Sequence, residues 1–126
     1  MFSNVSLTFT SESALESFIW QNLAKLLGFN PIAQQYYVEG QTCDILAVNS
    51  TRQLVVIELK NTEDRYIVQQ LTRYCHSLKT YLTFAEQVDY SKPIHLLAIA
   101  PTFHKHNQID RQYSQLHYQF TCFKIT

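Results

Sequence analysis

Residues 43–61, CDILAVNSTRQLVVIELKN, contain two runs of aliphatic residues on either side of a short polar segment. Runs rich in Val, Ile and Leu that are separated by a few polar residues are typical of a β-hairpin. The sequence therefore predicts one strand over residues 42–49 and a second strand over residues 53–61. Both strands are suited to burial, because neither has a continuous polar face.

Three ionisable side chains interrupt these apolar runs. Because side chains alternate between the two faces of a strand, Glu58 and Lys60 continue one apolar row of the second strand. By the same rule Asp44 continues the row of Leu46 and Val48 in the first strand. Burying an unpaired ion costs on the order of several kcal/mol, so another group must compensate these charges. Removal of either carboxylate is expected to leave the fold intact or more stable.

The two carboxylates are expected to face each other. Paired residues of an antiparallel hairpin have a constant index sum, so a turn centred on Thr51 sets Asp44 opposite Glu58. Two such carboxylates repel unless one takes a proton or a cation lies between them, and Lys60 offsets only one charge. Converging oxygen ligands of this kind suit Mg²⁺ or Mn²⁺. The structural alternative is a salt bridge of Lys60 with Asp44 or Glu58 at a strand end.

A long helix is predicted over residues 62–82, with Thr62 as its N-cap. Gln70 lies inside the apolar stripe of this helix, whereas Gln69 points away from it. A buried amide needs hydrogen-bond partners. Gln70 is therefore either a core residue bonded to backbone or a group that holds a ligand, a water or a phosphate oxygen, with Tyr74 one turn further on. The stripe is expected to consist of Ile67, Leu71, Tyr74, Leu78 and Tyr81.

A first helix is predicted over residues 11–28, with Ser11 or Ser13 as its cap. Glu12 falls close to the centre of its apolar stripe and is the better candidate for a further metal ligand. The alternative for Glu12 is a partner of the helix dipole, which is common for acids at a helix start. Glu16 fits a capping box with Ser13, which explains it without a functional role.

The remaining segments complete an α/β pattern. Strands are predicted over residues 31–39, 93–101 and 116–125, and a short helix over residues 106–114. The segment 93–101 is apolar on both faces and is expected to be central in a covered sheet. The order of elements indicates a mixed sheet flanked by helices.

Length and composition favour one compact domain over residues 1–126, with 46% hydrophobic and 16% charged residues. The net charge is zero, which excludes binding of nucleic acid through a generally basic surface. The cysteines Cys43, Cys75 and Cys122 lack metal-ligand spacing and indicate reduced thiols in a cytoplasmic protein. No segment is typical of a membrane span or a secretory signal.

Several basic and histidine side chains outside the strands are candidates for contact with a polyanion. Arg65 and Arg73 lie near the carboxylates and are expected either to meet phosphates or to solvate a helix face. His104 and His106 are expected in a loop, as solvated side chains or as contacts to a polyanion backbone.

Taken in order, Asp44, Glu58-Leu59-Lys60 and Gln70-x-x-x-Tyr74 resemble the motifs of the PD-(D/E)XK nuclease superfamily. Within it, the arrangement looks like the RecB-like branch and the C-terminal nuclease domain of archaeal NucS-type endonucleases. The segment that begins at Ser11 is similar to the leading helix of that domain. The resemblance extends from there to the last strand.

The resemblance implies a restriction-endonuclease-like αβββαβ core and Mg²⁺- or Mn²⁺-dependent hydrolysis of phosphodiester bonds in DNA. Asp44 and Glu58 would bind the metal, Lys60 would assist the attacking water, and Gln70 would support the site. Tyr74 would join Arg65 and Arg73 as a nucleic-acid contact. A homodimer or a partner protein would widen the contact with DNA.

The chain departs from the pattern at Gln41 and Thr42, where relatives often place glycine and a basic residue. The neutral charge and small size favour an alternative function. In that alternative the chain is a catalytically silent module of the nuclease fold, which depends on a partner for nucleic-acid contact.

Overall fold

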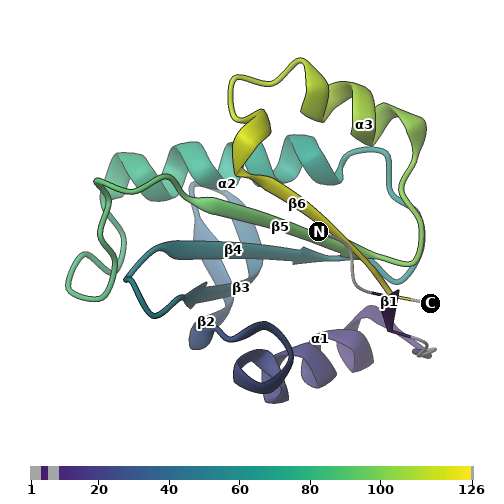
Figure 1. Ribbon diagram of the computed structural model, residues 1–126, viewed down its shortest axis with the longest axis horizontal. Coiled ribbons are helices and arrows are strands. Elements are labelled where there is room, and N and C mark those ends of the chain that lie inside the picture. The colour runs from purple at the N-terminus through teal and green to yellow at the C-terminus, as the bar shows by residue number, and fades with distance from the viewer. Residues whose placement is uncertain (1–3, 6–8, 126) are drawn as a thin grey trace.

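The computed structural model describes residues 4–5 and 9–125. A six-stranded mixed sheet forms its centre, with the strand order β1-β6-β5-β4-β3-β2. Helices α2 and α3 cover one face of the sheet and α1 covers the other (Figure 1). The strands are β1 Asn4–Val5, β2 Asn30–Val38, β3 Gln41–Val48, β4 Leu54–Leu59, β5 His95–Ala100 and β6 Phe120–Ile125. The helices are α1 Glu12–Gln21, α2 Ile67–Tyr81 and α3 Lys105–Gln112, with a π-helical turn η1 Leu23–Leu27 and a 3-10 turn η2 His117–Gln119.

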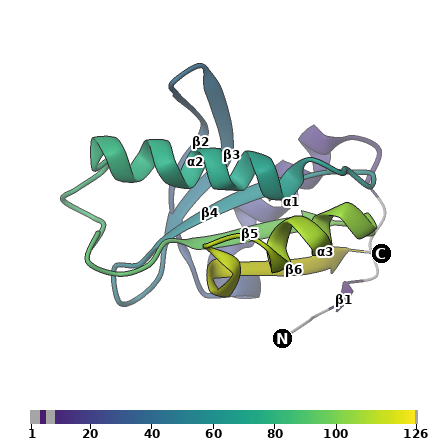
Figure 2. The same cartoon turned by 90° about the horizontal axis from the view of Figure 1, so that it is seen from above.

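The α/β class and the mixed sheet are therefore confirmed, with β1 as an edge strand that the sequence did not indicate. Strands β2, β3 and β4 form an antiparallel meander, whereas β5 and β6 run parallel to β4. Seen from above, α2 and α3 lie side by side over the sheet (Figure 2). The predicted last strand is shortened at its start, because residues 117–119 form the 3-10 turn.

The β3–β4 hairpin has the predicted register. Ile45 pairs with Ile57 and Val48 pairs with Leu54, and one further step in the same register places Asp44 opposite Glu58. All six residues of β4 are buried, which agrees with its nearly continuous apolar sequence.

The first predicted helix is interrupted at Asn22. The Asn22 side chain donates to the carbonyl of Phe18 at 2.8 Å, and its backbone N–H contacts the carbonyls of both Phe18 and Ile19. Competition of this kind for helical carbonyls loosens the turn. The chain continues as the π-helical turn η1, which ends at Gly28 with a left-handed φ of 75°.

Helix α2 begins at Ile67, so the prediction of Thr62 as its N-cap was wrong. The carboxylate of Asp64 accepts a hydrogen bond from the backbone N–H of Tyr66 at 2.7 Å, which holds the preceding residues in a turn. Tyr81 was also placed wrongly in the buried stripe, since it is 60% exposed where the helix ends. The other four residues of the predicted stripe are buried.

The two faces of the sheet carry separate apolar clusters. On one face α1 packs through Leu15 and Ile19 against residues of β4 such as Ile57. On the other face α2 packs through Ile67 and Leu71 against the alternate residues of the same strands. Within the described residues, no helix has the length and apolar character needed to cross a membrane.

Candidate active site

Asp44 lies one residue beyond Ile45, whose pair with Ile57 is the last regular pair between β3 and β4. Its Oδ2 accepts a hydrogen bond from the backbone N–H of Leu59 at 2.8 Å, and its Oδ1 accepts one from the Gln35 side chain at 3.2 Å. The half-buried carboxylate lines a cavity of about 330 Å³ together with Leu59, Gln35 and residues of α1. Both oxygens of Asp44 are thus oriented by protein donors.

The side-chain alternation of β3 breaks at this point. Cys43 and Leu46 lie in the same cluster on the α2 face, although strict alternation would put residues three apart on opposite faces. Asp44 instead opens toward α1, so its predicted row with Leu46 was wrong. In the neighbouring strand Gln35, which contacts Asp44, has a positive φ of 47° between two residues that pair with β3. Only a few per cent of residues other than glycine adopt such a φ.

Glu58 is the most deeply buried carboxylate of the site, at 3% exposure. Its Oε1 has no hydrogen-bond partner among the described residues, and its Oε2 lies 3.5 Å from the Lys60 Nζ. Burial and the nearby charge of Asp44 raise the pKa of Glu58 to about 8, and Lys60 offsets only part of this. Without a cation, Glu58 therefore holds a proton near neutral pH.

Lys60 contacts Glu58, as the structural alternative expected, and it contacts Asp64 as well. Its Nζ lies 3.5 Å from Glu58 Oε2 and 3.7 Å from Asp64 Oδ2. Burial lowers the pKa of Lys60, but the carboxylates of Glu58, Asp64, Glu12 and Asp44 outweigh this and raise it. The ammonium group is therefore fixed as a positive charge beside the two carboxylates.

A second cavity of about 320 Å³ opens from Glu58 toward α2. Three oxygens of its lining residues are buried without a hydrogen-bond partner, namely Gln41 Oε1, Glu58 Oε1 and Gln70 Oε1. Buried acceptors are rarely left unpaired, so three of them around one cavity indicate a place for a cation or an ordered water. Gln41 was not identified from the sequence, because a glutamine at the start of a strand carries no distinctive signal.

These oxygens fit a hard divalent cation. Mg²⁺ and Mn²⁺ take oxygen ligands, and Mg²⁺ usually takes one or two carboxylates and completes its shell with other oxygens and water. No group of three or more His, Cys, Asp or Glu side chains suited to a metal occurs in the described part of the chain. The thiol of Cys43 is soft and less suited to Mg²⁺ than oxygen ligands, and burial and the charges of Glu58 and Asp44 raise its pKa to about 12. Any metal here would depend on two carboxylates and on uncharged oxygens.

The acids of α1 are arranged differently from the prediction. Ser11 is the N-cap of α1 and accepts from the backbone N–H of Ala14, so a capping box of Glu16 with Ser13 was wrong. Glu16 instead accepts from the side chain of Gln35, whose amide also contacts Asp44. Burial and the Asp44 charge raise the pKa of Glu16.

Glu12, the predicted further ligand, lines the same cavity as Asp44. Gln34, which neighbours Gln35 in β2, also donates to Glu16, at 2.9 Å. Neither glutamine was found from the sequence, since their role depends on the packing of α1 against β2.

The predicted nucleic-acid contacts fall in two places. Tyr74 and Arg73 line the cavity of Glu58, with Arg73 exposed and Tyr74 buried. Arg65 lies apart from it, with its Nη2 3.0 Å from His106 Nδ1. The expectation that His104 lies in a loop was partly right, since it caps the start of α3.

The family model of the endonuclease NucS C-terminal domain matches residues 11–90. The chain belongs to this family. The match to the NucS C-terminal domain begins with the cap of α1 and ends before β5, so it includes all residues discussed above from Glu12 to Tyr74. The resemblance to NucS-type endonucleases noted in the sequence is thereby confirmed.

Solved structures support the same fold. EndoMS in complex with double-stranded DNA superposes with a TM-score of 0.71 at 21% identity, covering 98% of this chain and 47% of that one. A repair endonuclease from Pyrococcus abyssi gives a TM-score of 0.66 at 20% identity, covering 97% of this chain and 49% of that one. EndoMS in its apo form gives 0.64 at 20% identity, with 95% and 48% coverage. This chain thus spans about half the length of these proteins, and no curated protein matches it.

Proposed function

We propose that the chain is a metal-dependent endonuclease that hydrolyses phosphodiester bonds of DNA, with Mg²⁺ or Mn²⁺ held by Asp44 and Glu58. The observation that carries this proposal is the buried Glu58 Oε1, which has no hydrogen-bond partner among the described residues and belongs to a carboxylate that feels the charge of Asp44. Membership of the NucS C-terminal domain family supports the nuclease class. The complex of the structural neighbour EndoMS with double-stranded DNA supports DNA as the substrate.

The side chains of the site would have different roles in hydrolysis. A bound divalent cation would supply Lewis acidity, lowering the pKa of a water and offsetting charge on the phosphoryl oxygens. Lys60, fixed between Glu58 and Asp64, would hold the attacking water and stabilise the charge that develops on the phosphate. Gln70 would direct its free Oε1 at a ligand or water in the cavity of Glu58.

Asp44 would hold the metal together with Glu58, from the side of the cavity that Glu12 also lines. Asp44 is held by the Leu59 backbone and by Gln35, so its carboxylate is oriented before any ligand arrives. Glu12 lines the same cavity and would add negative charge there. Arg73 and Tyr74, at the rim and wall of the other cavity, would contact the DNA backbone, as Arg65 would from the start of α2.

A second candidate function is a catalytically silent module that binds or assembles with a partner. It is favoured by the absence of a three-residue metal cluster in the described residues and by the zero net charge. The chain also spans only half of its structural neighbours. A second copy or a partner protein would then supply the nucleic-acid contact.

Cleavage of supercoiled plasmid and labelled duplex DNA in Mg²⁺ or Mn²⁺ separates the two functions. The nuclease proposal expects cleavage by the wild type, and none by Glu58→Gln or Lys60→Gln. Glu86→Gln is the matched control, because it removes an exposed carboxylate outside the site. A wild type that binds DNA and leaves all forms intact would support the silent module, and equal cleavage by Glu58→Gln would refute the assigned site.

A further inference from the structure

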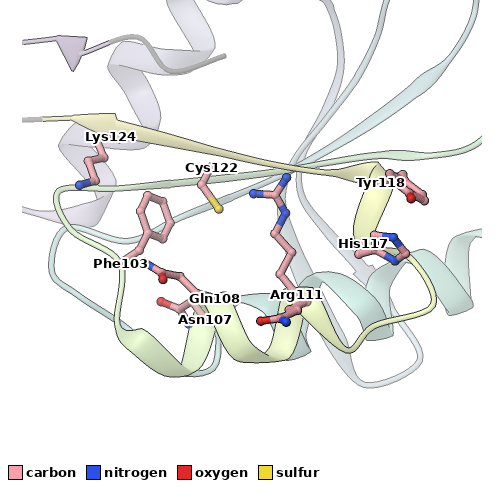
Figure 3. A pocket seen from close by; sticks show the side chains of 9 residues that line it. Phe103, Asn107, Gln108, Arg111, His117, Tyr118, Cys122 and Lys124 are labelled. Atoms are coloured by element: carbon pink, nitrogen blue, oxygen red, sulfur yellow. The ribbon is translucent and has the colours of Figure 1, made fainter.

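A cavity of about 860 Å³ lies between α3 and β6, on the face of the sheet that α2 also covers (Figure 3). None of the residues in the proposed active site lines it. The side chain of Arg111 extends from α3 toward β6, and Lys124 and Tyr118 stand at opposite ends of the cavity (Figure 3). It is therefore a separate concave surface.

The charge of this cavity is positive. Arg111 and Lys124 line it, and none of its lining residues is Asp or Glu. Within residues 4–5 and 9–125, neither cation forms an ion pair. The Arg111 charge reaches Cys122, where it offsets part of the rise in the thiol pKa caused by burial. In a chain of zero net charge, two cations in one cavity that form no ion pair with the described residues favour an anionic ligand.

Aromatic side chains also line the cavity. Tyr118 is 92% exposed, and its ring centroid lies 3.9 Å from that of His117. The His117 ring is itself fixed through its Nδ1, which lies 2.9 Å from the carbonyl oxygen of Ser114. Phe103 lines the opposite end of the cavity, beside Lys124 (Figure 3). Aromatic faces next to cations are the arrangement on which bases of an unpaired strand stack.

We propose that the cavity between α3 and β6 binds an unpaired segment of a nucleic-acid strand. Phosphates contact Arg111 and Lys124, and a base stacks on Tyr118. The exposed amides of Gln108 and Gln112 stand on the same side of α3 and offer hydrogen bonds to a base edge. The inference deepens the proposed function, because it gives the nuclease a contact for the part of its substrate outside the scissile bond.

The cavity is held at a fixed position relative to the active site. Glu58 pairs in register with Ala98 of β5, and Ala98 pairs with Cys122 in the cavity floor. Two strand spacings of about 4.8 Å separate Glu58 from Cys122 on the same face of the sheet, a span of the order of two nucleotides. The cavity floor and Glu58 are therefore neighbours across β5.

A buried side chain also joins the two regions. Asn107, 2% exposed on α3, donates to the backbone carbonyl of Asp64 at 2.9 Å. The Asp64 carboxylate in turn lies 3.7 Å from Lys60 Nζ. The start of α3 is thereby tied to the turn that follows β4, and the cavity cannot shift independently of Lys60.

Fluorescence anisotropy of a labelled oligothymidylate of about 12 nucleotides, in EDTA, tests the inference. Arg111→Glu combined with Lys124→Glu is expected to weaken binding at least about tenfold and to lower the salt dependence of log K by about 0.7 for each lost contact. Tyr118→Ala is expected to weaken binding about tenfold without changing that salt dependence. Lys25→Glu, one charge reversal at an exposed position beyond α1, is the control for Arg111→Glu and Lys124→Glu tested singly, and it is expected to bind like the wild type.

Circular dichroism and calorimetric titration with Mn²⁺ accompany each variant. Binding by the double variant that equals that of Lys25→Glu would overturn the inference. Equal affinity for a duplex of the same length would overturn the assignment to an unpaired segment, and complete displacement by free thymidine monophosphate would assign the cavity to a nucleotide instead. A chain that binds the oligothymidylate through this cavity and cleaves no DNA would refute the proposed function alone.

Discussion

The side chain of Asp44 in β3 accepts a hydrogen bond from the backbone N–H of Leu59 in β4, with 2.8 Å between Oδ2 and the nitrogen. Regular pairing between the two strands stops one step earlier, at Ile45 and Ile57. Leu59 lies between Glu58 and Lys60 in the sequence, so Asp44 holds the backbone from which both side chains project. The carboxylate has a structural role in addition to its proposed chemical one.

Replacement of Asp44 should therefore destabilise the fold, contrary to the expectation from the sequence. Asp44→Ala leaves the N–H of Leu59 unpaired, which is expected to lower the free energy of unfolding by about 1–3 kcal/mol. Asp44→Asn retains an acceptor oxygen and should lose much less, while both variants lose cleavage. Urea unfolding of the two variants in EDTA measures the difference, and equal stabilities would show that the hydrogen bond contributes nothing.

Glu58→Gln should have the opposite effect, and only at high pH. In the folded chain the pKa of Glu58 is raised to about 8, whereas the ordinary pKa of a glutamate, which applies to the unfolded chain, is 4.5. The folded state therefore binds more protons between these values, and the wild type loses stability as the pH rises through this window. Glutamine, which matches the protonated acid, should raise the free energy of unfolding by roughly 1–3 kcal/mol at about pH 9 and change it little at about pH 5.

Urea unfolding at the two pH values, with metal removed, measures this effect. Glu86→Gln serves as the control because its carboxylate is exposed. The prediction fails if Glu58→Gln gives the same change of stability at both pH values.

Metal binding should release a proton. Because the pKa of Glu58 is raised to about 8, binding of Mn²⁺ at neutral pH must displace the proton from its carboxyl group. The apparent affinity is then expected to rise about tenfold per pH unit below pH 8 and to level off above it. Calorimetry in buffers of different ionisation heat counts the protons. Release of none by the wild type, or as many by Glu58→Gln, would contradict the assignment of Glu58.

Gln35 allows a test of the strained backbone beside the site. Glycine normally weakens a strand relative to alanine, by roughly 0.5–1 kcal/mol. At Gln35 the order should reverse, because the positive φ of 47° costs alanine about 1 kcal/mol more than glycine. Thermal unfolding of Gln35→Gly and Gln35→Ala gives the comparison. The same pair at Gln34 should follow the normal order, and a normal order at both positions would show that Gln35 carries no strain.

The features that the sequence predicted depend on short-range patterns. The aliphatic runs around Thr51 determine a hairpin, and period-two burial then fixes its register and the approach of Asp44 to Glu58. The left-handed end at Gly28 follows from the freedom of glycine at positive φ.

What the sequence did not predict depends on contacts between distant segments. Gln35 and Gln41 border the site because β2 pairs with β3 and α2 packs over the sheet, and glutamine itself has no chemical signature. The late start of α2 depends on Asp64, whose carboxylate holds the preceding residues in a turn by accepting from the backbone N–H of Tyr66. The Asn107 side chain of α3 holds the same residue by donating to its backbone carbonyl. Capping rules consider only residues that are close in the sequence, so they cannot predict a contact between α3 and the start of α2.

The position of β6 between β1 and β5 bears on the order in which the sheet can assemble. Strand β5, almost wholly buried in the finished fold, keeps one edge open in any folding intermediate in which residues 120–125 have not yet paired with it. An apolar strand with an open edge is a template for pairing with other chains. Docking of β6 closes that edge and gives β1 its neighbour, so a chain whose last strand is displaced is expected to aggregate.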